Sequence, residues 1–366
     1  MYMVGDTIGD LSGRLLVQCR PGQAKNAARV ASAHGTGLVL TGRIPRPIVG
    51  ALREHGFTGP ILCDANRYSG RRRTAAQTGV RESWTAEQHD LGLVALTDSG
   101  YLAAHDWRGL RRILSDAARQ PGPVIAMLPL AARWFEHSVT ELVAELDCFG
   151  VPVAVAVEHA RDPFGVRYLI RGYLELLTAS VPVLLLRSNI SAVGALTHGT
   201  HAAAIGTTSH LRHVPPQLGR ATAGLPALAA FVPPLLGHHP LDALDRLTPY
   251  WHCDCHECAG RALTDLANAP RPEVSAFRHS LSAQLTLWST LHAAPCPATA
   301  WDEHCRRALS VHHRLAATVP GWYPPTNLHG WTTVGTAGTP PTSTRPTNTP
   351  PWHEAPGPEP RSSAQR

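Results

Sequence analysis

The sequence has no apolar run of the roughly 20 residues that a membrane-spanning helix requires. Its richest apolar runs, residues 151–157 and 181–186, are much shorter. No apolar signal peptide precedes the first predicted elements, and five of the eight cysteines are scattered along the chain (Cys19, Cys63, Cys148, Cys296 and Cys305). Such scattered cysteines do not suggest the disulfide framework of a secreted scaffold. We therefore expect a soluble protein of the reducing cytoplasm, with no membrane partner.

Charged residues are also few, at 16% of the 366 residues, whereas 43% are hydrophobic. A chain of this length and composition can bury one large core or two moderate ones, and a large α/β domain with an appendage fits. The net charge of +6 and the pI near 9.0 permit a polyanionic partner. Arginine clusters at residues 71–73, 111–112 and 306–307 are either part of such a surface or ordinary solvated faces.

Eight short, apolar, β-branched runs predict strands, at residues 14–18, 37–41, 60–63, 91–97, 123–128, 151–157, 181–186 and 202–206. Amphipathic segments of helical length lie between most of them, at residues 24–33, 48–55, 107–119, 138–149 and 166–178. Strands that alternate with helices predict parallel pairing, and continuous apolar strands indicate burial on both faces. This pattern favours a (β/α)8 TIM-type barrel over an open sheet, although residues 64–90 show no clear helix.

Three closely spaced cysteines, Cys253, Cys255 and Cys258, are followed by His279. Thiolate and imidazole ligands hold zinc tetrahedrally, with Zn–S distances of about 2.3 Å, so this motif predicts a structural zinc site. His252 and His256 are alternatives to His279 as the fourth ligand. A redox dithiol or a chance cluster is the alternative to a metal site.

We expect three parts along the chain: a barrel over residues 1–247, a zinc-binding helical subdomain over 248–322, and a tail over 323–366. The second part contains predicted helices at residues 272–292 and 301–317. The tail is dominated by Thr, Pro, Gly and Ser. Because such a composition buries too little apolar surface to offset its ordering entropy, we expect the tail to be disordered.

Three carboxylates follow predicted strands directly: Asp64, Asp98 and Glu158. The active site of a (β/α)8 barrel lies at the C-terminal ends of its strands, and a charge there is costly unless it meets solvent, a partner or a substrate. We therefore take these three residues as candidate catalytic groups. The alternative is a helix N-cap, or an ion pair with one of the nearby arginines Arg20, Arg43, Arg67 and Arg187.

The order of the motifs resembles the tRNA-guanine transglycosylase superfamily. Thr-Asp-Ser-Gly stands at residues 97–100, Ala-Ala-Ile-Gly-Thr-Thr at residues 203–208, and the cysteine hook with its histidine follows. In that family the hook binds zinc, and a Thr-Asp-Ser-Gly-Gly-Phe-Gln motif supplies an active-site aspartate. The resemblance implies that Asp98 is catalytic and that substrate-binding residues lie beside it and in a small-residue loop. The candidates for substrate binding are Ser99, Gly100, Arg187, Ser191 and Gly194.

Members of this family exchange a nucleobase at the glycosidic bond, using one aspartate as the nucleophile and a second for proton transfer. The resemblance implies the second role for Asp98. The family's nucleophile motif, Phe-Asp-Cys-Val-x-Pro-Thr-Arg, is replaced here by Ala-Ala-Phe-Val-Pro-Pro at residues 229–234, which contains no aspartate. Either Asp64, Glu158 or Asp162 then serves as the nucleophile, or the protein binds its partner without cutting the bond.

Three functions follow from these observations. The leading hypothesis is a transglycosylase-like glycosyltransferase that acts on tRNA, DNA or a nucleoside together with a free nucleobase. The second is a nucleic-acid-binding relative that keeps the structural zinc site, and the third is an unrelated barrel enzyme. Two carboxylates roughly 5 to 9 Å apart that face one pocket favour the enzyme, whereas separate ion pairs favour binding. A homodimer is a further expectation.

Overall fold

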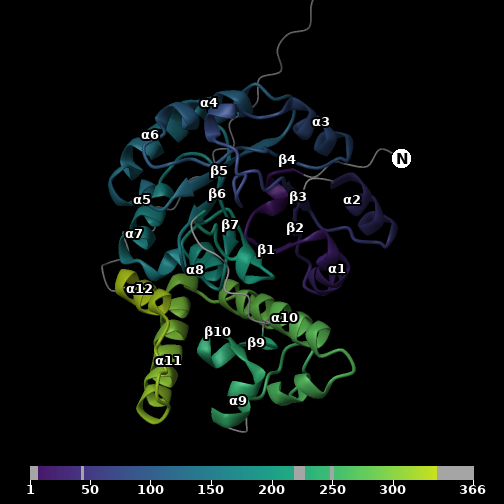
Figure 1. The fold of residues 1–366 in the computed structure, drawn as a ribbon, viewed down its shortest axis with the longest axis vertical. Coiled ribbons are helices and arrows are strands. Elements are labelled where there is room, and N and C mark those ends of the chain that lie inside the picture. Colours follow the sequence, from purple (N-terminus) through teal and green to yellow (C-terminus); the bar gives the residue numbers. More distant parts are fainter. Residues whose placement is uncertain (1–6, 43–44, 218–226, 248–250, 336–366) are drawn as a thin grey trace, which may run out of the picture.

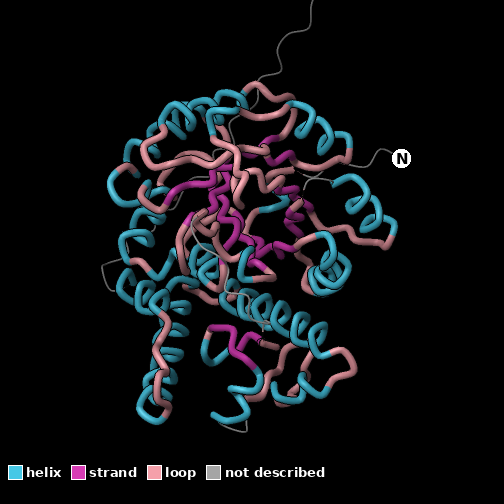
Figure 2. The backbone as a smooth tube through the Cα atoms, in the orientation of Figure 1, coloured by secondary structure: helices cyan, strands magenta, loops and turns pink. Residues whose placement is uncertain are grey.

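The computed structural model describes residues 7–42, 45–217, 227–247 and 251–335. Eight parallel strands form a nearly closed barrel, in the order β3-β2-β1-β8-β7-β6-β5-β4 (Figures 1 and 2). The strands are β1 (Arg14–Cys19), β2 (Leu38–Thr41), β3 (Ile61–Asp64), β4 (Ala95–Leu96), β5 (Val124–Ala131), β6 (Val153–Glu158), β7 (Val183–Ser188) and β8 (Ala202–Gly206). All eight predicted strands are present, so the predicted TIM-type barrel is confirmed.

The strands are buried on both faces, as their continuous apolar sequences predict. Every residue of β5, β7 and β8 is buried, and in β6 only the terminal Glu158 is not. Such strands face the barrel interior on one side and the helices on the other. Polar side chains with possible chemistry therefore lie at the C-terminal ends of the strands, such as Asp64 and Glu158, and in the loops that follow.

The outer layer consists of α1 (Ala24–Ala33), α2 (Pro45–Glu54), α3 (Glu82–Asp90), α4 (Trp107–Ala118), α5 (Trp134–His137), α6 (Val139–Phe149), α7 (Arg167–Leu176) and α8 (Ser191–Thr197). The sequence determines where several of these helices begin or end. The Asp106 carboxylate caps α4 by accepting a hydrogen bond from the Gly109 N–H at 2.9 Å, and Gly150 ends α6 with a φ of +66°. The sequence did not indicate α3, because it carries almost no apolar residue besides Trp84.

The C-terminal part contains a hairpin of β9 (Ala229–Val232) and β10 (Gly237–Pro240), followed by α9 (Leu241–Leu247), α10 (Pro272–His292), α11 (Pro297–Thr318) and α12 (Thr326–Gly335). Helix α10 contacts both α1 and β9, and therefore lies between the barrel and the hairpin (Figure 1). The predicted helix at residues 272–292 has these bounds, and α11 begins four residues before the predicted start. No helix in the described ranges has both the length and the apolar character that a membrane span needs.

The predicted disordered tail needs one correction, because residues 326–335 form α12. Leu328 and Trp331 of this helix are buried, and the Trp331 ring stacks on Phe164 with centroids 5.8 Å apart. A prediction from composition missed these two large apolar side chains within a stretch rich in Pro and Thr. Residues 336–366 of the predicted tail, like Arg43, lie outside the described residues.

The contact between α8 and the C-terminal helices is testable at Gly194. A Cβ atom there would lie 2.6 Å from Trp301 Nε1 and 2.7 Å from Trp331 Cε2, whereas Gly50 in α2 has no atom within 4 Å of the same position. We expect Gly194→Ala to lower the free energy of unfolding by about 1–3 kcal/mol through overpacking. The control Gly50→Ala should raise it by up to about 1 kcal/mol through helix propensity. Urea unfolding measures both, and similar effects of the two variants would contradict this packing.

Candidate functional site

Cys253, Cys255, Cys258 and His279 come together in one buried group, with their four ligand atoms within 4.8 Å of one another. The three cysteines lie on the turn that precedes α10, and the histidine lies on α10 itself. His279 Nδ1 is 3.0 Å from the Cys258 sulfur and 3.5 Å from the Cys255 sulfur. Three thiols and one imidazole at this spacing can hold one metal ion tetrahedrally. The structure thus groups the four predicted ligands together, without the alternatives His252 and His256.

The other nitrogen of His279 orients the ring. Its Nε2 lies 2.7 Å from the carbonyl oxygen of Phe231 in β9, so with Nδ1 facing the sulfurs Nε2 carries the hydrogen and donates it. The Phe231 N–H in turn donates to the Ser280 hydroxyl of α10 at 3.0 Å. The metal-ligand group therefore fixes the hairpin strand β9 against α10, in addition to closing the cysteine turn.

Asp64, at the end of β3, is 1% exposed and fully engaged by the protein. Its Oδ2 accepts hydrogen bonds from the Tyr68 hydroxyl at 2.8 Å and from Gln18 Nε2 at 3.1 Å, and lies 3.5 Å from Arg187 Nε. Its Oδ1 accepts from the Asn66 N–H at 2.8 Å. Arg187, a predicted substrate-binding residue, also donates to the Asn66 side-chain oxygen at 2.6 Å and is 3% exposed.

Asp98, in the segment after β4, is held by two arginines. Its side chain is completely buried. Oδ2 accepts hydrogen bonds from Arg67 Nη1 at 2.7 Å and from Arg81 Nε, and Oδ1 accepts from the Arg81 N–H at 2.9 Å. The carboxylate thus has charge-assisted partners on both oxygens.

Glu158, at the end of β6, accepts hydrogen bonds from Arg73 and from the Tyr101 hydroxyl. The Arg73 guanidinium lies over the Tyr101 ring, 3.5 Å from its centroid. Burial, and then the hydrogen bond to Glu158, raise the pKa of Tyr101, so the phenol stays a donor at neutral pH. Each of the three predicted catalytic carboxylates is therefore paired with its own arginine or arginines.

The loop between β3 and α3, residues 65–81, supplies most of these arginines. It contains five (Arg67, Arg71, Arg72, Arg73 and Arg81) and no Asp or Glu. Ala75 of this loop pairs in parallel with Tyr101, whose N–H donates to the Thr74 carbonyl at 2.7 Å. The loop therefore lies across the segment after β4. Arg71 and Arg72 are exposed and form no ion pair within the described ranges.

The other predicted substrate-binding residues lie in two separate places. Ser99 is fully buried, and a Cβ at Gly100 would lie 2.3 Å from the Ala75 carbonyl oxygen, so the 65–81 loop covers this turn. Ser191 is also buried and accepts a hydrogen bond from Trp331 Nε1 at 3.2 Å, and Gly194 faces the same tryptophan. Neither pair lines the cavities at the barrel mouth described below.

Arg212, which follows β8, was not among the predicted residues. Its Nε donates to the Gly206 carbonyl at 3.1 Å and its Nη2 to His238 Nε2 at 2.9 Å, and no carboxylate of the described chain pairs with it. Burial lowers the pKa of Arg212 to about 10, so it is charged at neutral pH. Burial, and then the charge of Arg212, hold the pKa of His238 well below its ordinary value, so the ring is a neutral acceptor. Only the folded structure reveals this unpaired cation.

Two cavities share Arg212 and His238. The first, of about 680 Å³, lies between the segments after β6 and β7, the β9–β10 hairpin and the start of α12. The second, of about 700 Å³, lies between the segment after β8 and α10. Asp162 lines the first, and burial raises its pKa although Asn189 Nδ2 donates to it at 2.7 Å. The barrel mouth thus offers a guanidinium and a carboxyl group that are not paired with each other.

Comparisons with known proteins add little to this geometry. No protein-family model matches the chain, and no curated protein does. Among solved structures, a mandelate racemase/muconate lactonizing protein from Herpetosiphon aurantiacus is similar, with 12% sequence identity and a TM-score of 0.33, over 54% of this chain and 56% of that chain. A structural similarity this low carries no argument about function.

The pairing of Asp98 with two arginines is testable by comparing its contribution to stability with that of an exposed ion pair. Removing one partner of a buried ion pair leaves an uncompensated buried charge, which costs about 3–5 kcal/mol. We expect Asp98→Asn to lower the free energy of unfolding by about that amount. Asp90→Asn, which removes an exposed pair with Arg46 at 3.2 Å, should cost less than about 1 kcal/mol. Equal losses in denaturant unfolding would show that Asp98 is not held as the geometry indicates.

Proposed function

We propose that this protein binds nucleic acid through phosphate contacts at the C-terminal face of the barrel, and that a structural zinc ion fixes the hairpin that completes this face. The observation that carries the proposal is Arg212, a half-buried cation with no carboxylate partner in the described chain, which lines two cavities. A charge that is partly withdrawn from water and has no counter-charge is unfavourable. An anionic group of a ligand would supply that counter-charge.

Other exposed arginines support a polyanionic partner over a single small anion. Arg161 is exposed on the rim of the first cavity, and Arg71 and Arg72 are exposed on the 65–81 loop. None of them pairs with an acid among the described residues. Arginine side chains of this kind supply most phosphate contacts in nucleic-acid complexes, and a net charge of +6 agrees with such a partner.

The pairing of the carboxylates weighs against base exchange and in favour of binding. Glycosyl transfer with two carboxyl groups needs both to face one pocket. Here Asp64, Asp98 and Glu158 each pair with different arginines, and the β9 segment has no aspartate where the transglycosylase nucleophile would stand. We therefore favour a binding protein, and a base-exchange enzyme is the outcome that would replace this proposal.

Zinc is the metal that best fits the Cys3His group. Three thiolates and one imidazole are the ligand set of a closed tetrahedral zinc site, which leaves no position open for a catalytic water. The eight cysteines are free thiols in the structure, in keeping with a reducing compartment such as the cytoplasm. The ion would thus stabilise the hairpin and α10 without taking part in chemistry.

The zinc assignment is testable by elemental analysis of the purified protein. Wild type should contain about one equivalent of zinc. Cys258→Ala should lose the metal and unfold at lower temperature, because metal binding contributes directly to folding. Cys305→Ala removes an equally buried thiol outside the group and should keep the zinc. Retention of the metal by Cys258→Ala, or less than about half an equivalent in wild type, would refute the assignment.

Nucleic-acid binding is testable with fluorescein-labelled bulk tRNA and single-stranded DNA. Affinity should fall linearly with the logarithm of salt concentration. Arg212→Gln should weaken binding by about 1.5–3 kcal/mol and reduce the salt slope by about 1, and Arg161→Gln should act in the same direction. Arg171→Gln, which removes an exposed charge on α7, should behave as wild type. Salt-independent binding, or equal effects of the three variants, would contradict the proposal.

The same preparations separate binding from base exchange. Wild type and Asp98→Ala are incubated with tRNA or DNA and labelled guanine, and the label in the polymer is counted. We expect no incorporation by either protein. Incorporation by wild type would establish base exchange and replace the binding proposal, whatever the stability of Asp98→Ala.

A further inference from the structure

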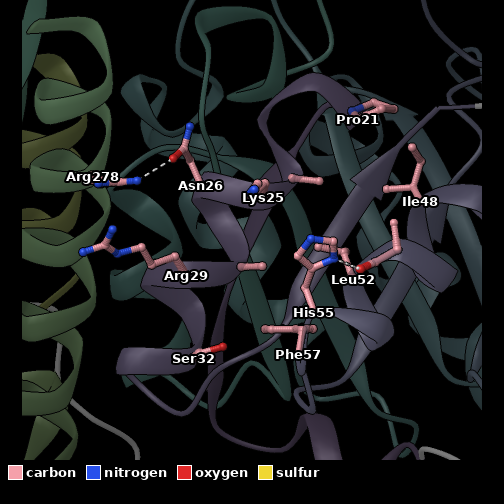
Figure 3. Close-up of a pocket in the computed structure, with 13 residues that line it drawn as sticks. Pro21, Lys25, Asn26, Arg29, Ser32, Ile48, Leu52, His55, Phe57 and Arg278 are labelled. Atoms are coloured by element: carbon pink, nitrogen blue, oxygen red, sulfur yellow. Dashed lines mark hydrogen bonds between the residues drawn. The ribbon is translucent and has the colours of Figure 1, made fainter. Parts of the chain in front are cut away.

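A third cavity, of about 410 Å³, lies on the outside of the barrel between α1 and α2, with Arg278 of α10 at one edge (Figure 3). It shares no residue with the two cavities at the barrel mouth. Its size falls in the range of small-molecule sites, roughly 300–1,000 Å³. The cavity is therefore large enough for a small ligand and is separate from the surface proposed to bind nucleic acid.

The floor of this cavity is apolar. Ala24, Ala28, Leu52 and Phe57 are buried beneath it, and Ile48 is half-buried on the α2 side. Figure 3 shows Ile48, Leu52 and Phe57 on one side and the polar side chains of α1 on the other. Alanine at two positions of α1 keeps the floor recessed. A ligand with an apolar body would therefore be desolvated on this floor.

The rim carries three cations and no carboxylate. Lys25 and Arg29 stand one helical turn apart on α1, and Arg278 completes the set. None of the thirteen residues that line the cavity is Asp or Glu. Like charges at i and i+4 repel, and Lys25 stands in the first turn of α1, where the helix dipole disfavours a cation. These positive charges are therefore unfavourable for two reasons in the free protein. A bound anion would compensate for both, as is expected at a functional site.

Arg278 supplies the second indication of an anion. Its Nη2 donates to the Asn26 side-chain oxygen at 2.8 Å, which fixes the guanidinium at the edge of the cavity. Its Nε is buried and has no hydrogen-bond partner. A buried charge-bearing donor without a partner is costly, and a carboxylate or phosphate can accept from the two edges of a guanidinium.

We propose that this cavity binds a small organic anion, with a carboxylate or phosphate head group between Lys25, Arg29 and Arg278 and an apolar body on the floor formed by α1 and α2. The inference does not depend on the proposed nucleic-acid binding. Charge complementarity and the recessed apolar floor select an amphipathic anion. A free inorganic anion would leave the floor wet, and a neutral apolar molecule would leave the cations unpaired.

Lys25 provides a direct readout, because it is the single lysine among 33 basic residues of the sequence. The protein is acetylated with an amine-reactive ester, and modification of Lys25 is measured by mass spectrometry in the presence of octyl phosphate, octanoate, inorganic phosphate or 1-octanol. Octyl phosphate and octanoate should protect Lys25, and phosphate or octanol alone should need at least tenfold higher concentrations. Equal protection by octanol, or no protection by either amphiphile at millimolar concentration, would overturn the proposal.

Variants of the cavity distinguish the effect of its charge from the effect of its shape. Calorimetric titration with octyl phosphate should show at least tenfold weaker binding to Arg29→Gln, and binding within a few-fold of wild type to Lys25→Arg, which keeps the charge. Ala28→Phe fills the floor without changing the charge and should also weaken binding at least tenfold. Arg171→Gln is the matched charge control. Wild-type affinity in Arg29→Gln or Ala28→Phe would contradict the site.

A further arm of the labelling experiment uses bulk tRNA in place of the amphiphiles. Protection of Lys25 by tRNA but not by octyl phosphate would overturn the small-anion site and would make this cavity an extension of the nucleic-acid surface. Failure of tRNA binding altogether, with protection by octyl phosphate intact, would remove only the proposed function.

Discussion

The pairing of every predicted catalytic carboxylate with an arginine is the interaction on which the barrel mouth depends. Eight strands buried on both faces leave no place for charge except at their ends. Asp64 and Asp98 are nonetheless almost completely buried there, which is tolerable only because a guanidinium lies beside each. The 65–81 loop, with five arginines and no acid, exists in this conformation because Asp98 and Glu158 hold it. The same loop covers Ser99 and Gly100. By holding the loop, the ion pairs of Asp98 and Glu158 therefore also keep these two residues away from solvent.

Much of the fold was predictable because its signals are local. Continuous apolar runs identified all eight strands, and cysteine spacing identified three of the four residues of the metal-ligand group. The gap between Cys258 and His279, long enough for a turn and the start of a helix, favoured His279 as the fourth ligand but left His252 and His256 open, and the structure places His279 with the three thiols. Helix α3 was missed because its buried side includes polar Thr85 and Gln88, which no apolar pattern reveals. Helix α12 was missed because two buried side chains were outweighed by the surrounding Pro and Thr.

The partners of the candidate site could not be predicted, because they depend on contacts between distant parts of the chain. Arg73 and Glu158 are 85 residues apart, and Arg187 reaches an Asn66 that is 121 residues away. The sequence offered Arg67 and Arg187 as ion-pair partners, and both do form such pairs. Nothing in it distinguished Arg212, whose importance is that no carboxylate of the described residues pairs with it. The missing counter-charge becomes visible only when the residues around the guanidinium are placed in three dimensions.

The metal-ligand group and Arg212 at the barrel mouth are linked by a short series of contacts. His279 bonds to the Phe231 carbonyl, Phe231 pairs with His238 across the β9–β10 hairpin, and their rings lie 5.6 Å apart. His238 then accepts the hydrogen bond of Arg212. The neutral state of His238 matters at the end of this series, since a protonated ring could not accept from a guanidinium. A metal ion bound by the Cys3His group would therefore act by position. It would hold β9, whose neighbour β10 carries His238, the side chain that bonds to Arg212 among the described residues. Loss of the metal would then release the guanidinium from its fixed orientation without touching any residue of the barrel.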